Sequence, residues 1–326
     1  MSKPKVFITR PILKIGLELI LDFCDAEIWP GNLPPSRTEL LQSVPGITGL
    51  LCLLTDQVDA KIMDAAGSGL KVISNCAVGV DNVDVSAATA RSIPVGNTPG
   101  VLTDATADMT MALLMVAARR VLEGDRLVRM GGWKTWSLDL LIGADMAGAT
   151  LGLVGFGRIG RAVARRAGGF NLRVIYTDPN PFVPEAGMQA DRVDFDTLLK
   201  ESDFVSLHTP LTEQTRGLMN ASTIAKMKST AILVNTSRGP VVDHASLYEA
   251  LKSKRIFAAA LDVTDPEPLP KESPLLTLDN CLVVPHIASA SRQSREKMSR
   301  MAAENLIAGL KGELLPNCVN PEVYSR

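Results

Sequence analysis

The sequence predicts an α/β protein built from two doubly wound lobes, each with a parallel sheet. Short apolar segments typical of buried strands alternate with segments that carry apolar residues at helical spacing, and this alternation occurs twice along the 326 residues. A glycine-rich turn, GFGRIG at 155–160, opens the second series of strands and helices and not the first. A chain of this length also exceeds one typical hydrophobic core, so two domains are expected.

The first hundred residues contain five βα steps. The apolar run ITGLLCLLT at 47–55 is nearly continuous, which is typical of a strand covered on both faces. The segment 12–23 has apolar residues at helical spacing, and Ser36 with Glu39 forms a capping-box pattern that opens another helix. The expected strands of this series are 5–9, 26–29, 47–55, 70–77 and 93–97.

A long helix is expected from Thr103 to about Met130, with Thr103 or Asp104 as its cap. The glycine-rich stretch that follows contains Trp133 and Trp136, and we expect it to form an extended arm outside the core. The second series then predicts a doubly wound nucleotide-binding sheet. Its expected strands are 150–154, 173–177, 203–208, 230–235, 257–262 and 281–285, followed by a final helix at 292–310.

Composition excludes several classes of function. Hydrophobic residues make up 46% and charged residues 21%, and the net charge of −1 argues against a nucleic-acid-binding surface. The longest apolar run, 111–118, is less than half of a membrane span, and the N-terminal run is too short for a signal peptide. The five cysteines are far apart and include no CxxC pair, so we expect no metal site and buried free thiols in a reducing cytoplasm.

The glycine turn has the context of a dinucleotide-binding motif, since an apolar strand precedes it and a helix follows it. Gly155 permits the tight turn, Gly157 lets the backbone approach a pyrophosphate, and Gly160 lets the helix pack close to the strand. Asp178 ends the next strand, where its carboxylate would accept hydrogen bonds from ribose hydroxyls and repel a 2′-phosphate. The segment TDPNPF around it has no cation, which favours NAD over NADP. The alternative is a loop carboxylate that only caps a turn.

A carbonyl that receives hydride also needs a proton donor near neutral pH, and the chain has only three histidines. His208 ends an expected strand at the edge where a dinucleotide lies, so a role beside the cofactor is expected. His244 is expected in the first turn of a helix, exposed to solvent. His286 follows the strand CLVVP at the end of the second series, where catalytic residues of this fold tend to lie, although a lone histidine there is more often structural.

Three charged residues follow neighbouring strands of the second series. Arg238, in NTSRGPVVD, could hold a substrate carboxylate through two parallel hydrogen bonds, or it could be a salt-bridged loop arginine. Asp262 ends the strand before the segment DVTDPEP. Glu267 in that segment could pair with a histidine and stabilise its protonated form, or it could be a solvated carboxylate in a proline-rich loop.

The motifs GFGRIG, NTSRGPVVD, ALDVTDPEP and VPHIASAS, in this order and at these intervals, resemble the D-isomer-specific 2-hydroxyacid dehydrogenase family. CAVGVDNVDV at 76–85 and NTPGVLTDATAD at 97–108 resemble its glyoxylate/hydroxypyruvate reductase branch most closely. The resemblance covers essentially the whole chain. It implies a Rossmann dinucleotide-binding domain, residues 99–291, inserted into a flavodoxin-like substrate-binding domain made of residues 1–98 and 292–326, with the active site in the cleft between them.

The resemblance also implies the roles of single residues. Arg238 would bind the substrate carboxylate, His286 would be the acid/base, and Glu267 would orient and charge His286. The backbone N–H groups of Val78 and Gly79 would hold the carboxylate from the other domain. Weaker candidates for the substrate pocket are Leu54 and Ser289. The residues expected to bind the cofactor are Thr106, Gly155, Gly157, Arg158, Ile159, Gly160, Asp178, His208, Pro210, Thr215, Thr236 and Asp262.

The expected activity is therefore NADH-dependent reduction of glyoxylate or hydroxypyruvate to the D-2-hydroxy acid by a cytoplasmic homodimer. Two departures from the family pattern, ADMAG at 144–148 and Thr264 in place of an aromatic residue, leave the shape of the substrate pocket open. The alternatives are a D-lactate, phosphoglycerate or phosphite type of dehydrogenase. A non-enzymatic, NAD-sensing partner protein of the same fold is a further alternative, although it would not require Arg238, Glu267 and His286 together.

Overall fold

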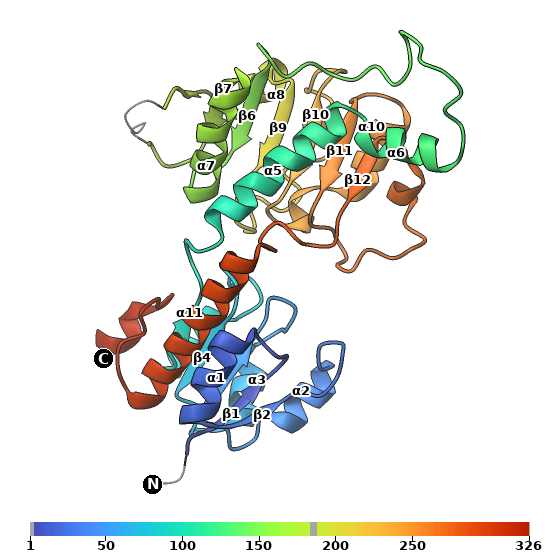
Figure 1. Ribbon diagram of the computed structural model, residues 1–326. Helices are drawn as coiled ribbons and strands as arrows, with labels where there is room; N and C mark the ends of the chain where they lie inside the picture. The colour runs from blue at the N-terminus through green and yellow to red at the C-terminus, as the bar shows by residue number, and fades with distance from the viewer. Residues whose placement is uncertain (1–2, 183–187, 326) are drawn as a thin grey trace. The chain divides into compact units, whose positions relative to one another are not determined.

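The computed structural model describes residues 3–182 and 188–325 and divides into two compact units (Figure 1). Unit 1 comprises Met1–Leu102 and Ala290–Arg326, and unit 2 comprises Thr103–Ser289. The cuts after Leu102 and Ser289 lie close to the expected domain boundaries. Each unit has its own parallel sheet covered by helices on both faces.

Unit 1 has a five-stranded sheet in the order β2-β1-β3-β4-β5, which is the flavodoxin-like order. Helices α2, α3 and α4 share one buried cluster with the sheet, whereas α1 and α11 pack against each other on the opposite face. That packing is close, because a Cβ at Gly16 would lie 2.2 Å from the carbonyl oxygen of Ser299. The elements are β1 (Lys5–Ile8), α1 (Lys14–Phe23), β2 (Asp25–Ile28), α2 (Arg37–Ser43), β3 (Gly49–Cys52), α3 (Ala60–Ala66), β4 (Val72–Asn75), α4 (Val85–Ala90), β5 (Val95–Gly96), α11 (Arg292–Lys311) and the 3-10 turn η4 (Pro321–Ser325).

Unit 2 has a seven-stranded parallel sheet in the order β12-β11-β10-β9-β6-β7-β8. The six expected strands are confirmed. The additional strand β8 consists of two exposed residues at the sheet edge, so it carries no apolar pattern by which the sequence could reveal it. The strands are β6 (Thr150–Val154), β7 (Arg173–Thr177), β8 (Asp191–Arg192), β9 (Phe204–Leu207), β10 (Ile232–Asn235), β11 (Ala258–Leu261) and β12 (Cys281–Val283).

The helices of unit 2 cover both faces of its sheet. One buried cluster joins α5 and α7 to the strands, and a second joins α8, α9 and α10 to the other face. The helices are α5 (Thr103–Ala118), α6 (Val121–Arg129), α7 (Arg158–Ala167), α8 (Phe195–Glu201), α9 (Ala221–Ile224) and α10 (His244–Lys252), with 3-10 turns η1 (Gly168–Phe170), η2 (Gly239–Val241) and η3 (Pro274–Thr277).

The expected single helix over 103–130 is wrong, because α5 ends at Ala118 and α6 begins at Val121. Between them Arg120 adopts a left-handed conformation, and its guanidinium donates two hydrogen bonds to the Glu123 carboxylate. The carbonyl of Ala118 accepts a hydrogen bond from the N–H of Ala144 at 2.9 Å, which satisfies a helix-end group that a continuous helix would pair internally. None of the residues of α6 is buried.

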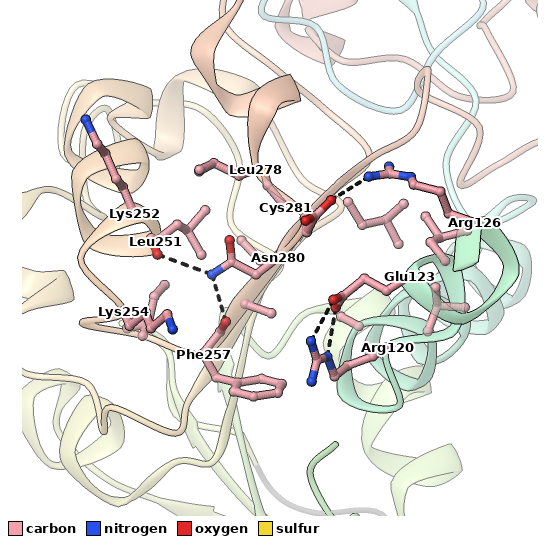
Figure 2. Close-up of a pocket in the computed structure, with 18 of the residues that line it drawn as sticks. Arg120, Glu123, Arg126, Leu251, Lys252, Lys254, Phe257, Leu278, Asn280 and Cys281 are labelled. Atoms are coloured by element: carbon pink, nitrogen blue, oxygen red, sulfur yellow. Dashed lines mark hydrogen bonds and ion pairs between the residues drawn. The ribbon is translucent and has the colours of Figure 1, made fainter. Parts of the chain in front are cut away.

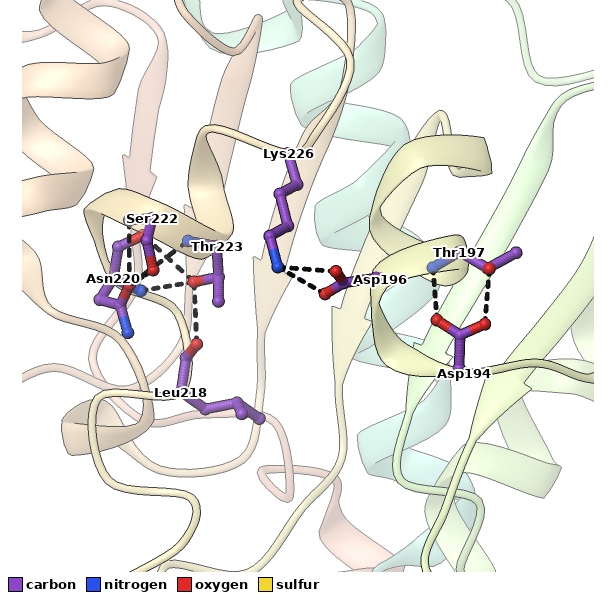
Figure 3. A network of polar contacts seen from close by, with 8 residues as sticks. All are labelled: Asp194, Asp196, Thr197, Leu218, Asn220, Ser222, Thr223 and Lys226. Atoms are coloured by element: carbon purple, nitrogen blue, oxygen red, sulfur yellow. Dashed lines mark hydrogen bonds and ion pairs between the residues drawn. The ribbon is translucent and has the colours of Figure 1, made fainter.

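Side-chain caps fix the short helices on the α8–α9 face (Figure 3). Asp194 caps α8 by accepting hydrogen bonds from the backbone N–H and the hydroxyl of Thr197, and Asn220 caps α9. Lys226 donates to both carboxylate oxygens of Asp196, at 2.6 and 2.8 Å, and so joins the segment after α9 to α8. Caps of this kind satisfy the backbone groups that helix ends leave unpaired.

No helix in residues 3–182 or 188–325 combines the length and apolar character needed to cross a membrane. The same residues contain no group of three or more His, Cys, Asp or Glu side chains arranged to hold a metal ion. All five cysteines are free; Cys24, Cys52 and Cys76 are buried, and the other two are half-buried.

Candidate active site

The carboxyl edge of the unit 2 sheet carries most of the expected site residues. The strand order reverses between β9 and β6, and ligands of open α/β sheets bind at the carboxyl edge where such a reversal occurs. Consecutive strand ends along this edge are followed, from β12 to β7, by His286, Asp262, Arg238, His208, the glycine turn and Asp178.

The glycine turn leaves backbone surface open where a pyrophosphate would approach. Gly155 has a φ of 94°, and a Cβ there would lie 2.6 Å from the carbonyl oxygen of His208. A Cβ at Gly160 would lie 2.4 Å from the oxygen of Gly155, so α7 packs directly on the turn. Gly157 begins α7 without a side-chain cap and has open space beside it. The exposed Arg158 and half-buried Ile159 form the first turn of α7, whose N–H groups suit an anion.

Asp178 connects the end of β7 to the glycine turn. Its Oδ2 accepts a hydrogen bond from the N–H of Phe156 at 2.7 Å, and its Oδ1 accepts one from the N–H of Asn180 at 2.9 Å. Within the chain, Asp178 therefore acts as a carboxylate that caps a turn, which was the alternative to a ribose-binding role. Each carboxylate oxygen can accept a further hydrogen bond, so the same contacts leave the ribose-binding role open.

His208 is half-buried, and its Nε2 lies 2.9 Å from the hydroxyl of Ser206. Burial lowers the pKa of His208 to about 4, so this imidazole is neutral at neutral pH and is not a proton donor there. The backbone of His208 packs against Gly155. Along the same loop, the hydroxyl of Thr215 donates to the carbonyl of Pro210 at 2.7 Å.

Two buried threonines connect α5 to the end of β10. The hydroxyls of Thr110 and Thr236 lie 2.9 Å apart, and Thr110 also donates to the carbonyl of Thr106 at 2.8 Å. Thr106 and Thr236 were expected from the sequence, whereas Thr110 was not. The only indication of Thr110 in the sequence is that it lies one helical turn after Thr106.

Glu267 and His286 form the side-chain contact that the sequence suggested. The Nδ1 of His286 lies 2.6 Å from Oε1 of Glu267, and the two side chains are 31% and 22% exposed for Glu267 and His286, respectively. The second carboxylate oxygen of Glu267 lies 3.4 Å from the N–H of Thr264. Because Nδ1 faces the carboxylate, Nε2 is the ring nitrogen left to face a substrate.

Asp262 holds the backbone around His286. His286 has a φ of 52°, a left-handed conformation that is uncommon for a residue with a Cβ. The carboxylate of Asp262 accepts the N–H groups of Ile287 at 2.6 Å and Ala288 at 2.9 Å, and its carbonyl accepts the N–H of His286 at 2.8 Å. Burial raises the pKa of Asp262, while the two N–H groups oppose that rise. This contribution of Asp262 to the turn was not foreseen from the sequence.

Arg238 follows β10 and is half-buried. Asn235 donates from its side chain to the carbonyl of Arg238 at 2.9 Å, and the guanidinium donates to the carbonyl of Ser237 at 2.9 Å. A Cβ on the next residue, Gly239, would lie 1.8 Å from the carbonyl oxygen of Thr264. The loop of Arg238 therefore packs directly on the segment that leads to Glu267.

The expectation that His244 is exposed is wrong in part. His244 begins α10 as expected, but both ring nitrogens are buried and have no hydrogen-bond partner in the described residues. Burial lowers the pKa of His244, and the neighbouring Asp265 opposes this effect. The segment after β11, which contains Asp265, lies beside the first turn of α10 and helps to bury His244. The local sequence around His244 does not predict this contact.

In unit 1 a buried polar network supports the segments expected to bind substrate. The side-chain amide of Asn82 donates to the carbonyls of Leu53 and Asp56, each at 3.0 Å. Asn75 donates to the carbonyl of Gly79 at 3.0 Å, which ties the turn that contains Val78 to the same network. Across residues 3–182 and 188–325, the N–H groups of Val78 and Gly79 make no hydrogen bond. They remain available to an anion, and Leu54 lies on the segment that Asn82 holds.

Unit 2 contains a pocket of about 490 Å³ (Figure 2). Its walls come from the end of α5, from α6 and from β12. Two ion pairs, Arg120–Glu123 and Arg126–Asp279, lie on its rim. It contains none of the expected catalytic residues. Ser289, the remaining substrate candidate, is buried at the end of unit 2.

Known proteins share this chain's sequence and fold. Residues 111–288 match the family model of the D-isomer specific 2-hydroxyacid dehydrogenase, NAD binding domain. The chain is 50% identical over 325 residues to a glyoxylate reductase from Korarchaeum cryptofilum, covering 98% of this chain and 97% of that protein. It is 46% identical over 318 residues to a human glyoxylate reductase/hydroxypyruvate reductase, covering 96% of this chain and 97% of the human protein.

Solved structures agree with the sequence comparisons. A protein from Thermus thermophilus has a TM-score of 0.90 and 48% identity, covering 97% of this chain and 99% of that chain. An NADPH-dependent glyoxylate/hydroxypyruvate reductase from Sinorhizobium meliloti, solved with NADP and malonate, has a TM-score of 0.85 and 30% identity, covering 98% of both chains. The chain therefore belongs to the D-isomer specific 2-hydroxyacid dehydrogenase family and is an oxidoreductase that uses a nicotinamide dinucleotide.

Proposed function

We propose that the chain reduces glyoxylate or hydroxypyruvate to the corresponding D-2-hydroxy acid with NADH, and that His286 is the proton donor. The observation that carries the proposal is the 2.6 Å contact between His286 Nδ1 and Glu267 Oε1 at the carboxyl edge of the unit 2 sheet. A carboxylate at this distance accepts a hydrogen bond from Nδ1 and orients the ring, which leaves Nε2 to donate the proton that a reduction requires.

The residues on this edge fit a nicotinamide dinucleotide. The uncapped start of α7 and the open space beside Gly157 suit the pyrophosphate, and Asp178 suits the adenosine ribose. When bound, the nicotinamide supplies the hydride that reduces the α-carbon of the 2-oxo acid. We propose NADH as the preferred form because a carboxylate repels the 2′-phosphate of NADPH.

The chain's own groups would bind, orient and protonate the substrate. Arg238 would hold the substrate carboxylate through its guanidinium fork. Glu267 would keep Nδ1 of His286 protonated, so that the proton on Nε2 is directed to the oxygen on which charge develops. Asp262 would keep the His286 turn in its left-handed conformation during each cycle.

We further propose that the N–H groups of Val78 and Gly79 bind the substrate carboxylate. Neither N–H is used within the described residues, and Asn82 and Asn75 hold their turn. Asn82→Ala should therefore raise the KM for glyoxylate about tenfold with a smaller change in kcat, because a misplaced turn weakens binding before chemistry.

The test of the proposed reaction is a turnover screen of the purified chain. Loss of NADH absorbance is measured with glyoxylate, hydroxypyruvate and pyruvate, and formation of NADH is measured with NAD⁺ and D-3-phosphoglycerate or phosphite. Glyoxylate or hydroxypyruvate should give the highest kcat/KM. A higher kcat/KM for pyruvate, phosphoglycerate or phosphite would reassign the substrate, and absence of turnover with all of them would contradict the proposed reaction.

We also propose a homodimer formed through the arm that follows α5, residues 121–142. Nine large apolar side chains in this arm are exposed, including Trp136 at 73% and Leu138 at 85%. Such a concentration of exposed apolar surface is typical of an interface in a homo-oligomer.

A further inference from the structure

The structure brings a cation to Asp178 that the neighbouring sequence does not contain. Strand β8 pairs in parallel with β7, which aligns Arg192 with Tyr176, two residues before Asp178. The NH2 group of Arg192 donates to the carbonyl of Asp178 at 2.7 Å and lies 3.4 Å from the carbonyl of Pro179. The guanidinium is thereby fixed beside the residue expected to meet the adenosine ribose.

Most of the Arg192 fork remains available to a ligand. A guanidinium has five N–H donors, and both contacts of Arg192 come from one terminal nitrogen. Among the described residues, no side chain accepts a hydrogen bond from its Nε or NH1 groups, and no carboxylate forms an ion pair with it. The adjacent Asp191 lies 3.8 Å from Arg173 instead. Arg192 is exposed, so a ligand can reach it.

The carboxylate of Asp178 makes no side-chain hydrogen bond or ion pair with this guanidinium. Both of its oxygens accept backbone N–H groups, from Phe156 in the glycine turn and from Asn180. The carboxylate and the guanidinium therefore lie at the ends of two neighbouring strands without pairing with each other. A ribose hydroxyl is suited to the carboxylate, and a 2′-phosphate is suited to a guanidinium fork, which is how this class of site distinguishes the two cofactors.

We propose that Arg192 determines cofactor specificity by binding the 2′-phosphate of NADP(H), and that it thereby limits the preference for NADH that Asp178 produces. The chain uses both cofactors, with NADH favoured by a modest factor. The inference rests on the proposed function only in assigning the dinucleotide to the glycine turn.

The direct test measures binding and needs no turnover. Isothermal titration calorimetry of the full chain gives Kd values for NAD⁺ and NADP⁺ with the wild type, Arg192→Ala, Arg192→Lys and the control Arg173→Gln. Arg173 lies at the opposite end of β7 and loses the same charge. We expect wild-type NADP⁺ to bind within about tenfold of NAD⁺, since one exposed charge pair contributes modestly.

Arg192→Ala should weaken NADP⁺ binding about tenfold and change the Kd for NAD⁺ by less than about twofold. Arg192→Lys should retain part of the NADP⁺ affinity, and Arg173→Gln should retain all of it. The same order should hold for 2′,5′-ADP against 5′-AMP, which isolates the 2′-phosphate. The ratio of kcat/KM with NADPH to kcat/KM with NADH, measured on the same variants, should change in the same way as the ratio of the two Kd values.

The outcomes separate the two proposals. If NAD⁺ binds but the ratio of the two Kd values is the same in Arg192→Ala and wild type, the role of Arg192 is wrong and the proposed function stands. A wild type that binds NAD⁺ but not NADP⁺ also overturns it. If both dinucleotides bind with the expected ratios but no 2-oxo acid is reduced, the proposed reaction fails and the role of Arg192 stands. Binding of neither dinucleotide contradicts both.

Discussion

Glu267→Gln removes one negative charge from the His286 pair and keeps a side chain of the same shape. The 2.6 Å contact is short enough for a charge-assisted hydrogen bond, which contributes about 1.5–3 kcal/mol, whereas a neutral bond contributes about 1 kcal/mol. The difference is about 0.5–2 kcal/mol, and because the side chains are 22% and 31% exposed, solvent screens part of it, so we expect a loss of about 1 kcal/mol. At 1.36 kcal/mol per tenfold change, this corresponds to a fall of about fivefold in kcat/KM for glyoxylate.

The loss should appear in both directions, because the same His286 ring donates the proton in reduction and accepts it in oxidation. The amide oxygen introduced by Glu267→Gln can still accept a hydrogen bond from Nδ1, so the loss reports the missing charge and not a released ring.

The assay measures kcat/KM in each direction for wild type, Glu267→Gln and Glu272→Gln. Glu272 lies in the same loop, is exposed and pairs only with Lys271 among the described residues, so its variant controls for the loss of one loop charge. His286→Ala should lower kcat at every pH while the Kd for NADH is largely kept. If Glu267→Gln leaves kcat/KM unchanged in both directions, the pair has no part in the reaction and our reasoning is refuted.

Three further predictions concern other parts of the chain. Asp262→Asn leaves one backbone N–H in the turn after His286 without an acceptor. The free energy of unfolding in urea should therefore decrease by about 1–3 kcal/mol, and kcat should fall about tenfold or more. An unchanged kcat would mean that the turn keeps its conformation without this carboxylate. Burial lowers the pKa of His208 to about 4, below its unfolded value, so the unfolded chain binds more protons than the folded chain between about pH 6.5 and 4. The free energy of unfolding should therefore decrease by up to roughly 3 kcal/mol as the pH is lowered through this range. His208→Gln should reduce that decrease, and nitrogen NMR should show a neutral ring at pH 6. Finally, sedimentation should give a wild-type mass twice 34.9 kDa and a monomer for Trp133→Glu/Trp136→Glu, whereas a monomeric wild type at micromolar concentration would remove the proposed role of the arm.

The sequence by itself determined every strand except β8, and the edge on which the site lies. Buried parallel strands are continuous apolar runs, so their ends could be identified, and chemically active residues follow directly after them. Gly155, Arg238 and His286 were found in this way, and each follows a strand of the unit 2 sheet. The motifs that carry the family resemblance lie on the same loops, which is why the order of residues alone was enough to recognise the family.

Only the tertiary structure decided which side chains meet. The contact of Glu267 with His286 and the two N–H groups held by Asp262 depend on how β11 and β12 pair, and local composition favoured a solvated Glu267. Arg192 reaches Asp178 because a two-residue strand adds to the sheet edge, where exposed residues carry no periodic signal. Apolar periodicity reports which face of an element is buried, whereas polar contacts between distant segments depend on the register and closure of the fold, and these arise only when the whole sheet has formed.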